Sequence, residues 1–222
     1  MHWSKQVCGA LLVVLAIARI EQAEAQFGSF FRDQAGKFDY YVFSLSWSPE
    51  YCAGTQGGGN STQCNGGRQF GFVVHGLWPQ NERGYPQSCS SNSRVNKEMI
   101  LRMLPIMPSE QLIRHEWKKH GTCSGLSASQ YFEKVEDAYA LVTIPPPYKN
   151  PRDAMSVEPR QLKNDFVAAN RNFDEKNFAI MCRGRFLSEV RVCLDKDLNP
   201  RACGADIRDS CRAEKVILRP VR

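Results

Sequence analysis

The cysteines constrain this chain more than any other feature of its sequence. One of the nine, Cys8, lies in an N-terminal apolar run that has the form of an export signal. An even number of remaining cysteines in an exported chain indicates four disulfides formed in an oxidising compartment. No two of them have the two to four intervening residues typical of zinc ligands, so disulfides are favoured over a metal. The residues alone leave all of the roughly one hundred pairings open. The eight are Cys52, Cys64, Cys89, Cys123, Cys182, Cys193, Cys203 and Cys211.

Residues 1–25 have the pattern of a cleavable signal peptide, with cleavage near Ala25. They combine a basic start, an apolar run from Val7 to Ile17 and a small-residue end. We therefore expect a secreted or periplasmic protein whose mature chain, residues 26–222, forms a single domain. The apolar run is too short to span a bilayer, and no later stretch is long enough, so no membrane partner is expected.

The charge balance favours a polyanionic partner without identifying one. The formal net charge is +6, and it does not change when the signal is removed, because the signal carries two basic and two acidic residues. A net charge of this size can steer a polyanion toward the protein. It does not say which polyanion.

Alternating apolar residues predict two strands in the first half of the chain. The first covers residues 38–47 and the second residues 70–75, with a loop rich in Gly, Ser and Asn at residues 54–67 between them. The second strand is predicted to end at His75, next to Gly76. Trp47, in the first strand, is expected to lie in the core.

Helical spacing and cap residues predict three helices in the middle of the chain. They cover residues 93–107, 109–120 and 127–142. The second has Ser109 as its N-cap and Gly121 just past its end.

The C-terminal third is expected to mix a loop, a helix and strands. It contains a Pro-rich loop at 144–159, a helix at 160–170, strands at 177–183 and 186–194, a loop-like tail at 196–212 and a last short strand at 215–218. Strands and helices do not alternate regularly, and the paired strands have short connections. The predicted fold class is therefore α+β, a disulfide-stapled single domain with a central antiparallel sheet packed with several helices.

Histidine is concentrated in two short segments. Once the signal is set aside, three histidines remain: His75 in FVVHGLWPQ, and His115 and His120 in HEWKKHGTC. Histidine is the side chain whose ordinary pKa suits proton transfer near neutral pH. The concentration points to acid–base chemistry.

The second segment would present its polar groups on one face of a helix. At 100° per residue, His115, Lys119, Glu116 and His120 lie at roughly 0°, 40°, 100° and 140°, which is less than half of the circumference. Trp117, at roughly 200°, points away and is expected in the core. One face therefore offers two imidazoles, a carboxylate and an ammonium.

Cleavage of RNA by its own 2′-hydroxyl needs such a set of groups. A base must take the proton of the hydroxyl, an acid must protonate the departing 5′-oxygen, and the negative charge of the transition state must be met between them. A nearby glutamate can orient an imidazole and favour its charged form. Because the nucleophile belongs to the substrate, no cofactor or metal is required. DNA, which lacks this hydroxyl, should not react.

Each of these residues also has a structural explanation. A single histidine at a strand end is usually structural, Lys119 could simply complement the helix dipole, and Glu116 could pair with lysines on a solvated face. Trp78 and Tyr85 could stack on an unpaired base, although Trp78 could equally belong to the core. Only the conjunction of the two segments favours catalysis.

At this point the sequence resembles the ribonuclease T2 family of secreted acid ribonucleases, and most closely its bacterial branch, which includes periplasmic ribonuclease I. The resemblance is carried by FSLSWSPEYC, FGFVVHGLWPQ, HEWKKHGTC and FAIMCRGRFLSEVRVCLDKDLNPRAC, and it extends from about Phe38 to Cys211. It implies an α+β fold and an endoribonuclease that cuts single-stranded RNA through 2′,3′-cyclic phosphate ends, with little base preference. We expect such an enzyme to act as a monomer.

The resemblance also implies roles for the residues of the two segments. His75 matches the histidine that serves as acid for the leaving oxygen, and His120 matches the base. The two labels could be exchanged, because the two residues swap roles in the second, hydrolytic step. His115 matches a phosphate-binding histidine, while Glu116 and Lys119 match the pair that stabilises the transition state.

Substrate-binding residues are implied less uniformly. Trp78 matches the tryptophan of the primary base site, and Tyr85 is a candidate for the same pocket. Gln80 stands where many fungal members have an acidic residue that contacts the base, and Leu112 replaces an aromatic residue common just before the second segment. These departures bear on base preference and leave the chemistry unchanged.

The same resemblance implies a pairing for the cysteines. The first disulfide of the set would tie the loop after Trp78 to the end of the catalytic helix and so hold the two histidine segments together. The implied disulfides are Cys89–Cys123, Cys182–Cys211, Cys193–Cys203 and Cys52–Cys64.

Two other functions fit part of the sequence. A zinc hydrolase is suggested by the His-Glu pair at His115, but zinc ligands on one helix are four residues apart, whereas His115 and His120 are five apart and diverge by roughly 140°. An RNA-binding protein without turnover would usually have lost a histidine from one of the segments, and none is missing. The cleaving enzyme is preferred over both.

Overall fold

The computed structural model describes residues 34–54 and 61–221. The predicted signal peptide and the start of the predicted mature chain lie outside these ranges. The strands are β1 (Tyr40–Trp47), β2 (Phe72–Gln80), β3 (Met155–Val157), β4 (Phe178–Arg183), β5 (Phe186–Leu194) and β6 (Val216–Leu218). The helices are α2 (Ser48–Ala53), α3 (Ser61–Cys64), α4 (Lys97–Met103), α5 (Glu110–Lys119), α6 (Ala128–Leu141) and α7 (Pro159–Ala169). Short 3-10 turns lie at Gly121–Cys123, Pro146–Tyr148 and Glu175–Asn177.

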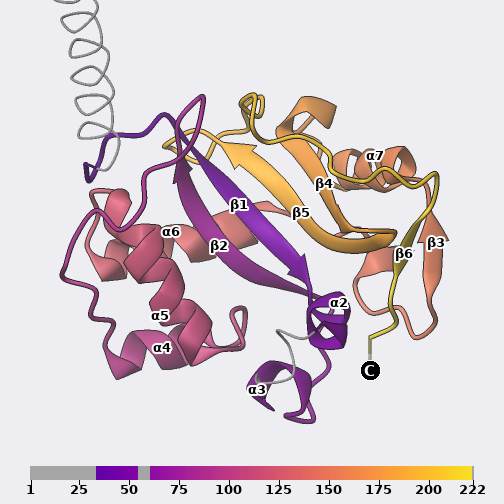
Figure 1. Ribbon diagram of the computed structural model, residues 1–222, viewed down its shortest axis with the longest axis horizontal. Helices are drawn as coiled ribbons and strands as arrows, with labels where there is room; N and C mark the ends of the chain where they lie inside the picture. Colours follow the sequence, from indigo (N-terminus) through magenta and orange to yellow (C-terminus); the bar gives the residue numbers. More distant parts are fainter. Residues whose placement is uncertain (1–33, 55–60, 222) are drawn as a thin grey trace, which may run out of the picture.

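The strands form one twisted sheet with the order β2-β1-β5-β6-β3, and β4 pairs with β5 (Figure 1). All pairs are antiparallel except β5 with β6, which meet in parallel at Phe186 and Ile217. The predicted α+β fold with a central sheet is therefore confirmed, with one parallel contact that the sequence did not indicate. No helix within the described ranges is long and apolar enough to cross a membrane.

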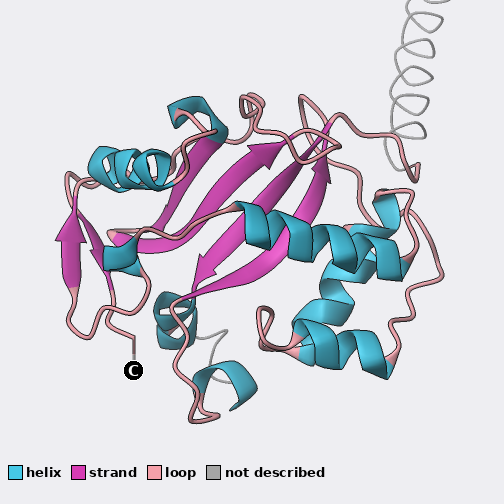
Figure 2. Ribbon diagram, turned by 180° about the vertical axis from the view of Figure 1, so that it is seen from behind, coloured by secondary structure: helices cyan, strands magenta, loops and turns pink. Residues whose placement is uncertain are grey.

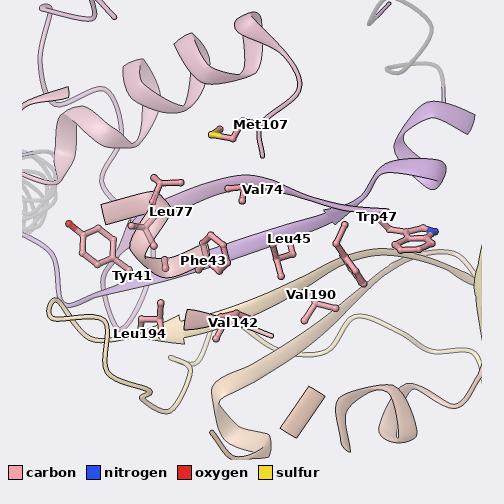
Figure 3. Close-up of a cluster of buried hydrophobic side chains, with 14 of the residues drawn as sticks. Tyr41, Phe43, Leu45, Trp47, Val74, Leu77, Met107, Val142, Val190 and Leu194 are labelled. Atoms are coloured by element: carbon pink, nitrogen blue, oxygen red, sulfur yellow. The ribbon is translucent and has the colours of Figure 1, made fainter. Parts of the chain in front are cut away.

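The main core lies between one face of the sheet and the helices. Figure 2, which shows the molecule from the side opposite to Figure 1, has α6 crossing in front of the sheet, with α4 and α5 beside it. Trp47 is fully buried, as predicted. Figure 3 shows part of this core, in which the side chains of β1, β2 and β5 point to the same side. The labelled core residues are Tyr41, Phe43, Leu45, Trp47, Val74, Leu77, Met107, Val142, Val190 and Leu194.

A β-bulge at His75 interrupts the pairing of β2 with β1. Leu45 lies opposite Val74 and Ser44 lies opposite Gly76, so His75 is the extra residue between them. Bulges re-aim side chains and are frequent near functional sites. The prediction that the strand begins at residue 70 and ends at His75 is wrong, because β2 begins at Phe72 and continues past the bulge to Gln80.

The extra residue reverses the alternation of the strand beyond it. Val74 and Leu77 both pack in the main core, although they are three residues apart, and Trp78 packs in a second cluster on the opposite face of the sheet. In an unbroken strand, residues 74 and 78 would share a face. The bulge therefore brings Trp78 to the face that carries His75.

β2 is the outermost strand on its side of the described sheet, and neighbouring segments occupy its free backbone groups. The amide of Val74 donates to Ile106 O at 2.9 Å, and Oη of Tyr131 in α6 donates to Leu77 O at 2.9 Å. Pro79 has no amide proton, and proline is tolerated in strands mainly at such edges. These contacts attach the helices to the strand that carries His75.

Helix α5 follows its capping signals. The Ser109 side chain accepts a hydrogen bond from Leu112 N at 3.3 Å, as the sequence predicts for an N-cap. The helix ends at Lys119, and His120 is its C-cap, just before Gly121. Trp117 is 6% exposed and lies in the main core, which confirms the predicted orientation of the helix.

Other predicted boundaries are wrong where local signals were weak. The helix expected at 93–107 is only Lys97–Met103, because Asn96 caps it and Pro105 follows closely. The Pro-rich segment 144–159, expected to be a loop, contains strand β3, which pairs with β6. The segment 54–67, also expected to be a loop, contains α3, and α2 was not predicted.

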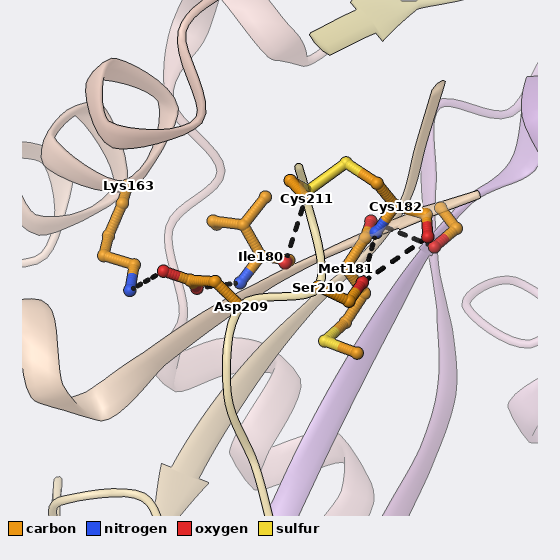
Figure 4. The surroundings of a disulfide bond; sticks show 8 residues. Lys163, Ile180, Met181, Cys182, Asp209, Ser210 and Cys211 are labelled. Carbon is orange, nitrogen blue, oxygen red and sulfur yellow. Dashed lines mark hydrogen bonds and ion pairs between the residues drawn. A yellow bond between two sulfur atoms is a disulfide. The ribbon is translucent and has the colours of Figure 1, made fainter. Parts of the chain in front are cut away.

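The four disulfides are those that the resemblance implies: Cys52–Cys64, Cys89–Cys123, Cys182–Cys211 and Cys193–Cys203. Cys89–Cys123 ties the loop after β2 to the turn after α5, where Ser88 N also donates to Lys119 O at 2.8 Å. In Figure 4, Cys182–Cys211 attaches the C-terminal tail to β4, beside the hydrogen bond from Ile180 N to Asp209 Oδ1 at 2.7 Å.

Candidate active site

The two histidine segments meet in one cleft. His75 and Trp78 come from β2, and His120 comes from the end of α5. The Trp78 indole lies between the two imidazoles, with ring centroids 5.0 Å from His75 and 5.4 Å from His120. The full lining is His75, Trp78, Gln80, Gly84, Tyr85, His115, Glu116, Lys119, His120, Arg191, Asp206 and Ile207.

Helix α5 contributes four of these side chains at graded depths. His115 is exposed, Lys119 is partly buried, His120 is 7% exposed and Glu116 is 1% exposed. This gradient follows from the helical arc, since Glu116 and His120 lie closer to the core-facing side than His115 does. The predicted grouping of the four on one helix face is confirmed.

Glu116 is held at the bottom of the cleft by Trp78. Nε1 of the indole donates a hydrogen bond to Glu116 Oε2 at 2.6 Å. Gly76 makes room for this contact, because a Cβ at that position would overlap Glu116 Oε2 and lie 2.5 Å from Trp78 Nε1. The glycine between His75 and Trp78 therefore allows the helix carboxylate to approach the strand.

His75 is held from β5 by a carboxylate. Glu189 Oε1 lies 2.6 Å from His75 Nδ1. Arg191 contacts Glu189 Oε2 through Nε at 2.9 Å and through Nη2 at 2.8 Å. On the other side of the ring, His75 Nε2 lies 3.7 Å from Glu116 Oε1. The imidazole therefore stands between two carboxylates, with its Nε2 at the cleft.

These contacts favour the charged imidazole at His75. Burial alone lowers the pKa of His75, but the hydrogen bond with Glu189 and the charges of Glu116 and Glu189 outweigh it, so the pKa is raised. Burial would raise the pKa of Glu189, yet the bond with His75 and the charges of His75 and Arg191 lower it to about 2. Glu189 is thus a carboxylate that accepts the Nδ1 proton of His75.

The pKa of Glu116 is shifted in the opposite direction from that of Glu189. Its burial raises its pKa to about 7, although the charge of His75, the bond from Trp78 and the charge of Lys119 act against the increase. The group therefore changes charge near neutral pH. Below that point it is a neutral acid that can donate a hydrogen bond.

The other two imidazoles favour the neutral form. Burial and the charges of Lys119, His115 and His75 lower the pKa of His120 to about 3. Its Nδ1 is buried and has no hydrogen-bond partner in the part of the chain that the structure describes. The pKa of His115 is also lowered, by partial burial and by the charges of Lys119, His75 and Lys118.

The predicted substrate-binding residues are divided between two cavities. Tyr85 lines the cleft, is 45% exposed and has its ring 5.9 Å from that of His120. Gln80 and Trp78 also line it but are only 4% and 8% exposed. Leu112 lies instead in a neighbouring cavity on the other side of His75. That cavity is lined by Ser46, Glu50, Tyr51, Gln63, Val73, His75, Leu112, Arg183, Ser188 and Glu189.

Several residues of the site were not predicted from the sequence. Glu189 and Arg191 are the most important, and the available signal was a pair of opposite charges two residues apart in a strand whose other positions, apart from Ser188, are apolar. Asp206 and Ile207 come from the tail, where Asp206 Oδ2 accepts from Gly84 N at 2.5 Å and so fixes the loop that carries Tyr85. No local pattern indicates that this tail reaches the cleft.

The cleft has no arrangement of ligands suited to a metal ion. Across residues 34–54 and 61–221, no three side chains of His, Cys, Asp or Glu are grouped so as to hold one. The histidines of the cleft contact carboxylates or aromatic rings instead. These contacts suit proton transfer between organic groups.

Comparison with known proteins identifies the family. The model of the ribonuclease T2 family matches residues 38–203. A ribonuclease of Aeromonas hydrophila is 36% identical over 86% of this chain and 90% of its own length, and a probable ribonuclease of Haemophilus influenzae is 36% identical over 66% and 62%. Among solved structures, RNase NT in complex with 5′-AMP has a TM-score of 0.67 at 23% identity, covering 84% of this chain and all of its own; it shares the fold.

Proposed function

The chain belongs to the ribonuclease T2 family, and from that premise we propose that it is an endoribonuclease that cleaves single-stranded RNA without a metal, by attack of the 2′-hydroxyl on the adjacent phosphorus. The observation that carries the proposal is that His75 and His120 line one cleft on either side of Trp78. A ribose and its 3′-phosphate between the two imidazoles would meet a proton acceptor on one side and a proton donor on the other.

His120 acts as the base of the first step. Its imidazole is neutral, because burial and the neighbouring cations lower its pKa to about 3. The negative charge of a bound phosphate raises this pKa and makes the imidazole a better proton acceptor. As the proton leaves the 2′-oxygen, that oxygen forms its bond to phosphorus.

His75 acts as the acid of the first step. Its raised pKa keeps it as an imidazolium, with Nε2 at the cleft. It gives that proton to the 5′-oxygen as the P–O5′ bond breaks. The products are a 2′,3′-cyclic phosphate and a 5′-hydroxyl end, and the two imidazoles have exchanged protonation states, so they are ready for the reverse roles in hydrolysis of the cyclic ester.

Glu116, Lys119 and His115 surround the phosphate. Lys119 and His115 lie nearer the mouth of the cleft and supply positive charge or hydrogen bonds to the non-bridging oxygens. Glu116, whose pKa is about 7, acts as a neutral acid under mildly acidic conditions. It then donates a hydrogen bond where a carboxylate would repel the phosphate.

The nucleobase of the substrate lies against Tyr85 at the open side of the cleft. Tyr85 is 45% exposed, whereas Trp78 is 8% exposed and has the Arg191 guanidinium 5.1 Å from its ring centre. Stacking of this kind tolerates several bases, which supports little base specificity. The complex of RNase NT with 5′-AMP supports nucleotide binding by this fold.

The setting of the reaction is also proposed. We infer a monomer that is secreted or periplasmic, with residues 1–25 removed as a signal peptide and residues 26–222 forming the ribonuclease domain. Four disulfides support an oxidising compartment. DNA and membranes are not expected to be partners.

One experiment tests the reaction. Purified protein is incubated in chelator with a single-stranded RNA and with DNA of the same sequence, and the ends of the products are analysed. We expect RNA fragments with cyclic phosphate ends and intact DNA. Loss of cleavage in chelator that zinc restores would contradict the metal-free mechanism, and cleavage of DNA would contradict the role of the 2′-hydroxyl.

A further inference from the structure

We propose that Glu189 is a positioning residue for His75, whose carboxylate holds the imidazole by Nδ1 so that Nε2 presents its proton to the cleft. The inference rests on the proposed function, since it concerns the acid of that reaction. Its geometric basis is the 2.6 Å contact between Glu189 Oε1 and His75 Nδ1, which joins residues 114 positions apart in the chain.

The two oxygens of Glu189 have different partners. Oε2 accepts a hydrogen bond from Nε of Arg191 and forms an ion pair with Nη2 of the same guanidinium, and Oε1 faces the imidazole. Ser46 Oγ lies 3.4 Å from Oε1. The arginine thus holds Oε2, while Ser46 and the imidazole lie at Oε1, so each oxygen of the carboxylate has its own partners.

The sheet dictates this arrangement. Glu189 and Arg191 are two residues apart in β5 and therefore share a face. Glu189 lies opposite Ser46 of β1, which in turn lies opposite Val73 of β2. The bulge at His75 then turns the imidazole across β1 toward the carboxylate.

Stability alone does not explain a charged pair at this place. β5 lies between β1 and β4, and the Glu189 and Arg191 side chains are only 13% and 23% exposed. Removing both charges from water costs more than apolar residues of the same size would cost there. A function for the carboxylate at His75 accounts for this cost.

The two nitrogens of the His75 imidazole face different groups. On the β5 side, Glu189 occupies Nδ1 and Arg191 contributes an opposing positive charge. On the α5 side, Glu116 Oε1 lies 3.7 Å from Nε2. Since Nδ1–H is committed to Glu189, the proton available for transfer is on Nε2, and the negative carboxylate stabilises the imidazolium that carries it.

A comparison of leaving groups tests whether Glu189 acts through His75. An RNA dinucleotide needs a proton on its departing 5′-oxygen, whereas a nucleoside 3′-(4-nitrophenyl phosphate) does not, because nitrophenolate is a stable anion. We expect Glu189→Gln to lower kcat for the dinucleotide about 10- to 100-fold, by analogy with the loss when the hydrogen-bond partner of a metal-binding histidine is removed. For the aryl ester, kcat should fall by less than about threefold. This is much less than the rate factor that a general acid contributes. Equal losses on both substrates, or no loss on the dinucleotide, would overturn the inference.

Two further variants complete the comparison. Glu136→Gln makes the same chemical change in α6, where Glu136 pairs with Arg102 at the surface, and it should leave both substrates unaffected. In a His75→Ala background, Glu189→Gln should have no further effect on the dinucleotide, because the residue through which it acts is gone. An additional loss of more than about tenfold there would contradict the inference.

The titration of His75 gives an independent measurement. Nuclear magnetic resonance of the labelled imidazole should show its pKa falling in Glu189→Gln and unchanged in Glu136→Gln; an unchanged His75 in Glu189→Gln would overturn the inference. If Glu189→Gln does not fold, the same measurements are made on Glu189→Asp, whose shorter carboxylate should produce the same selective loss. Failure of the wild-type protein to cleave RNA would count against the proposed function, whereas cleavage that is insensitive to residue 189 would count against this inference alone.

Discussion

Nε1 of the Trp78 indole donates a hydrogen bond to Oε2 of Glu116 at 2.6 Å, and this buried bond joins β2 to α5 beside the two imidazoles. Burial raises the pKa of the Glu116 carboxyl, and the contact with Trp78 opposes that increase while it holds the carboxyl in place. Trp78 is thus tied to the chemistry of the cleft in addition to any role in base binding. The first two predictions follow from this bond.

Trp78→Phe should lower kcat about tenfold with a small change in KM. Phenylalanine keeps a ring but removes the donor, and an unmet buried acceptor costs about 1–3 kcal/mol. The pKa of Glu116 should rise, so the alkaline limb of the pH–rate profile should move to higher pH. Steady-state kinetics across pH provide the measurement; an unmoved limb with altered base preference would show that the indole serves only the base.

Gly76→Ala should impair both stability and cleavage. The added Cβ would meet Glu116 Oε2 and Trp78 Nε1, and crowding of this kind costs about 1–3 kcal/mol. Gly67→Ala is the matched control, because Gly67 has φ +73° and open space around its Cβ position. The control should lower the melting temperature and leave kcat unchanged; normal kcat in Gly76→Ala would contradict the prediction.

Cleavage should be fastest on the acid side of neutrality. As pH rises through about 7, Glu116 becomes an anion beside the phosphate, and as pH rises through the raised pKa of His75 that group loses the proton that it must donate, so the rate falls. As pH falls far enough to protonate His120, whose pKa is lowered, the base is lost. The check is kcat/KM against pH in chelator. A rate that still climbs above about pH 9 would be inconsistent with a charged imidazole as the acid.

Removing Cys89–Cys123 by Cys89→Ala with Cys123→Ala should affect both stability and catalysis. Chain-entropy arguments give about 4 kcal/mol for this disulfide and about 3 kcal/mol for Cys52–Cys64. Only the first holds the loop after β2 against the end of α5. Denaturant unfolding should therefore show similar losses for the two double variants, while the Cys89–Cys123 variant alone loses kcat; equal catalytic losses would refute this distinction.

Tyr85→Ala should raise KM about 5- to 150-fold and change kcat less, since stacking of one base is worth about 1–3 kcal/mol. Leu112→Ala, in the neighbouring cavity on the other side of His75, gives the comparison. Leu112→Ala should change the preference for the nucleobase of the nucleotide that carries the leaving 5′-oxygen. Dinucleotides that vary one base at a time separate the two effects. An unchanged KM in Tyr85→Ala would place the base elsewhere.

Helix α5 could be predicted because its signals are local. Ser109, Gly121 and the helical arc define where α5 begins, ends and faces, and the structure follows them. The segment before α4 was misjudged because Asn96 caps a shorter helix than the apolar spacing suggests. Strand β3 was missed because its partner, β6, is more than fifty residues away in the chain and is itself only Val216–Leu218.

The arrangement around His75 could not be predicted in the same way. A bulge is a relation between two strands, and the sequence of β2 reads as a strand that stops at Gly76. Glu189 reaches the imidazole because β1 and β5 pair in one register, which no motif near His75 specifies. The sequence therefore indicated which groups take part, and the tertiary pairing determined how the imidazole is held.

The outer edge of β2 is protected from pairing with a second copy of the chain. An open strand edge is a template on which a second copy of a chain can add, which leads to aggregation. Here Ile106 O and Tyr131 Oη already occupy backbone groups along that margin, and Pro79 offers no donor. The strand that carries His75 is thereby protected from intermolecular pairing, although it lies at the border of the sheet.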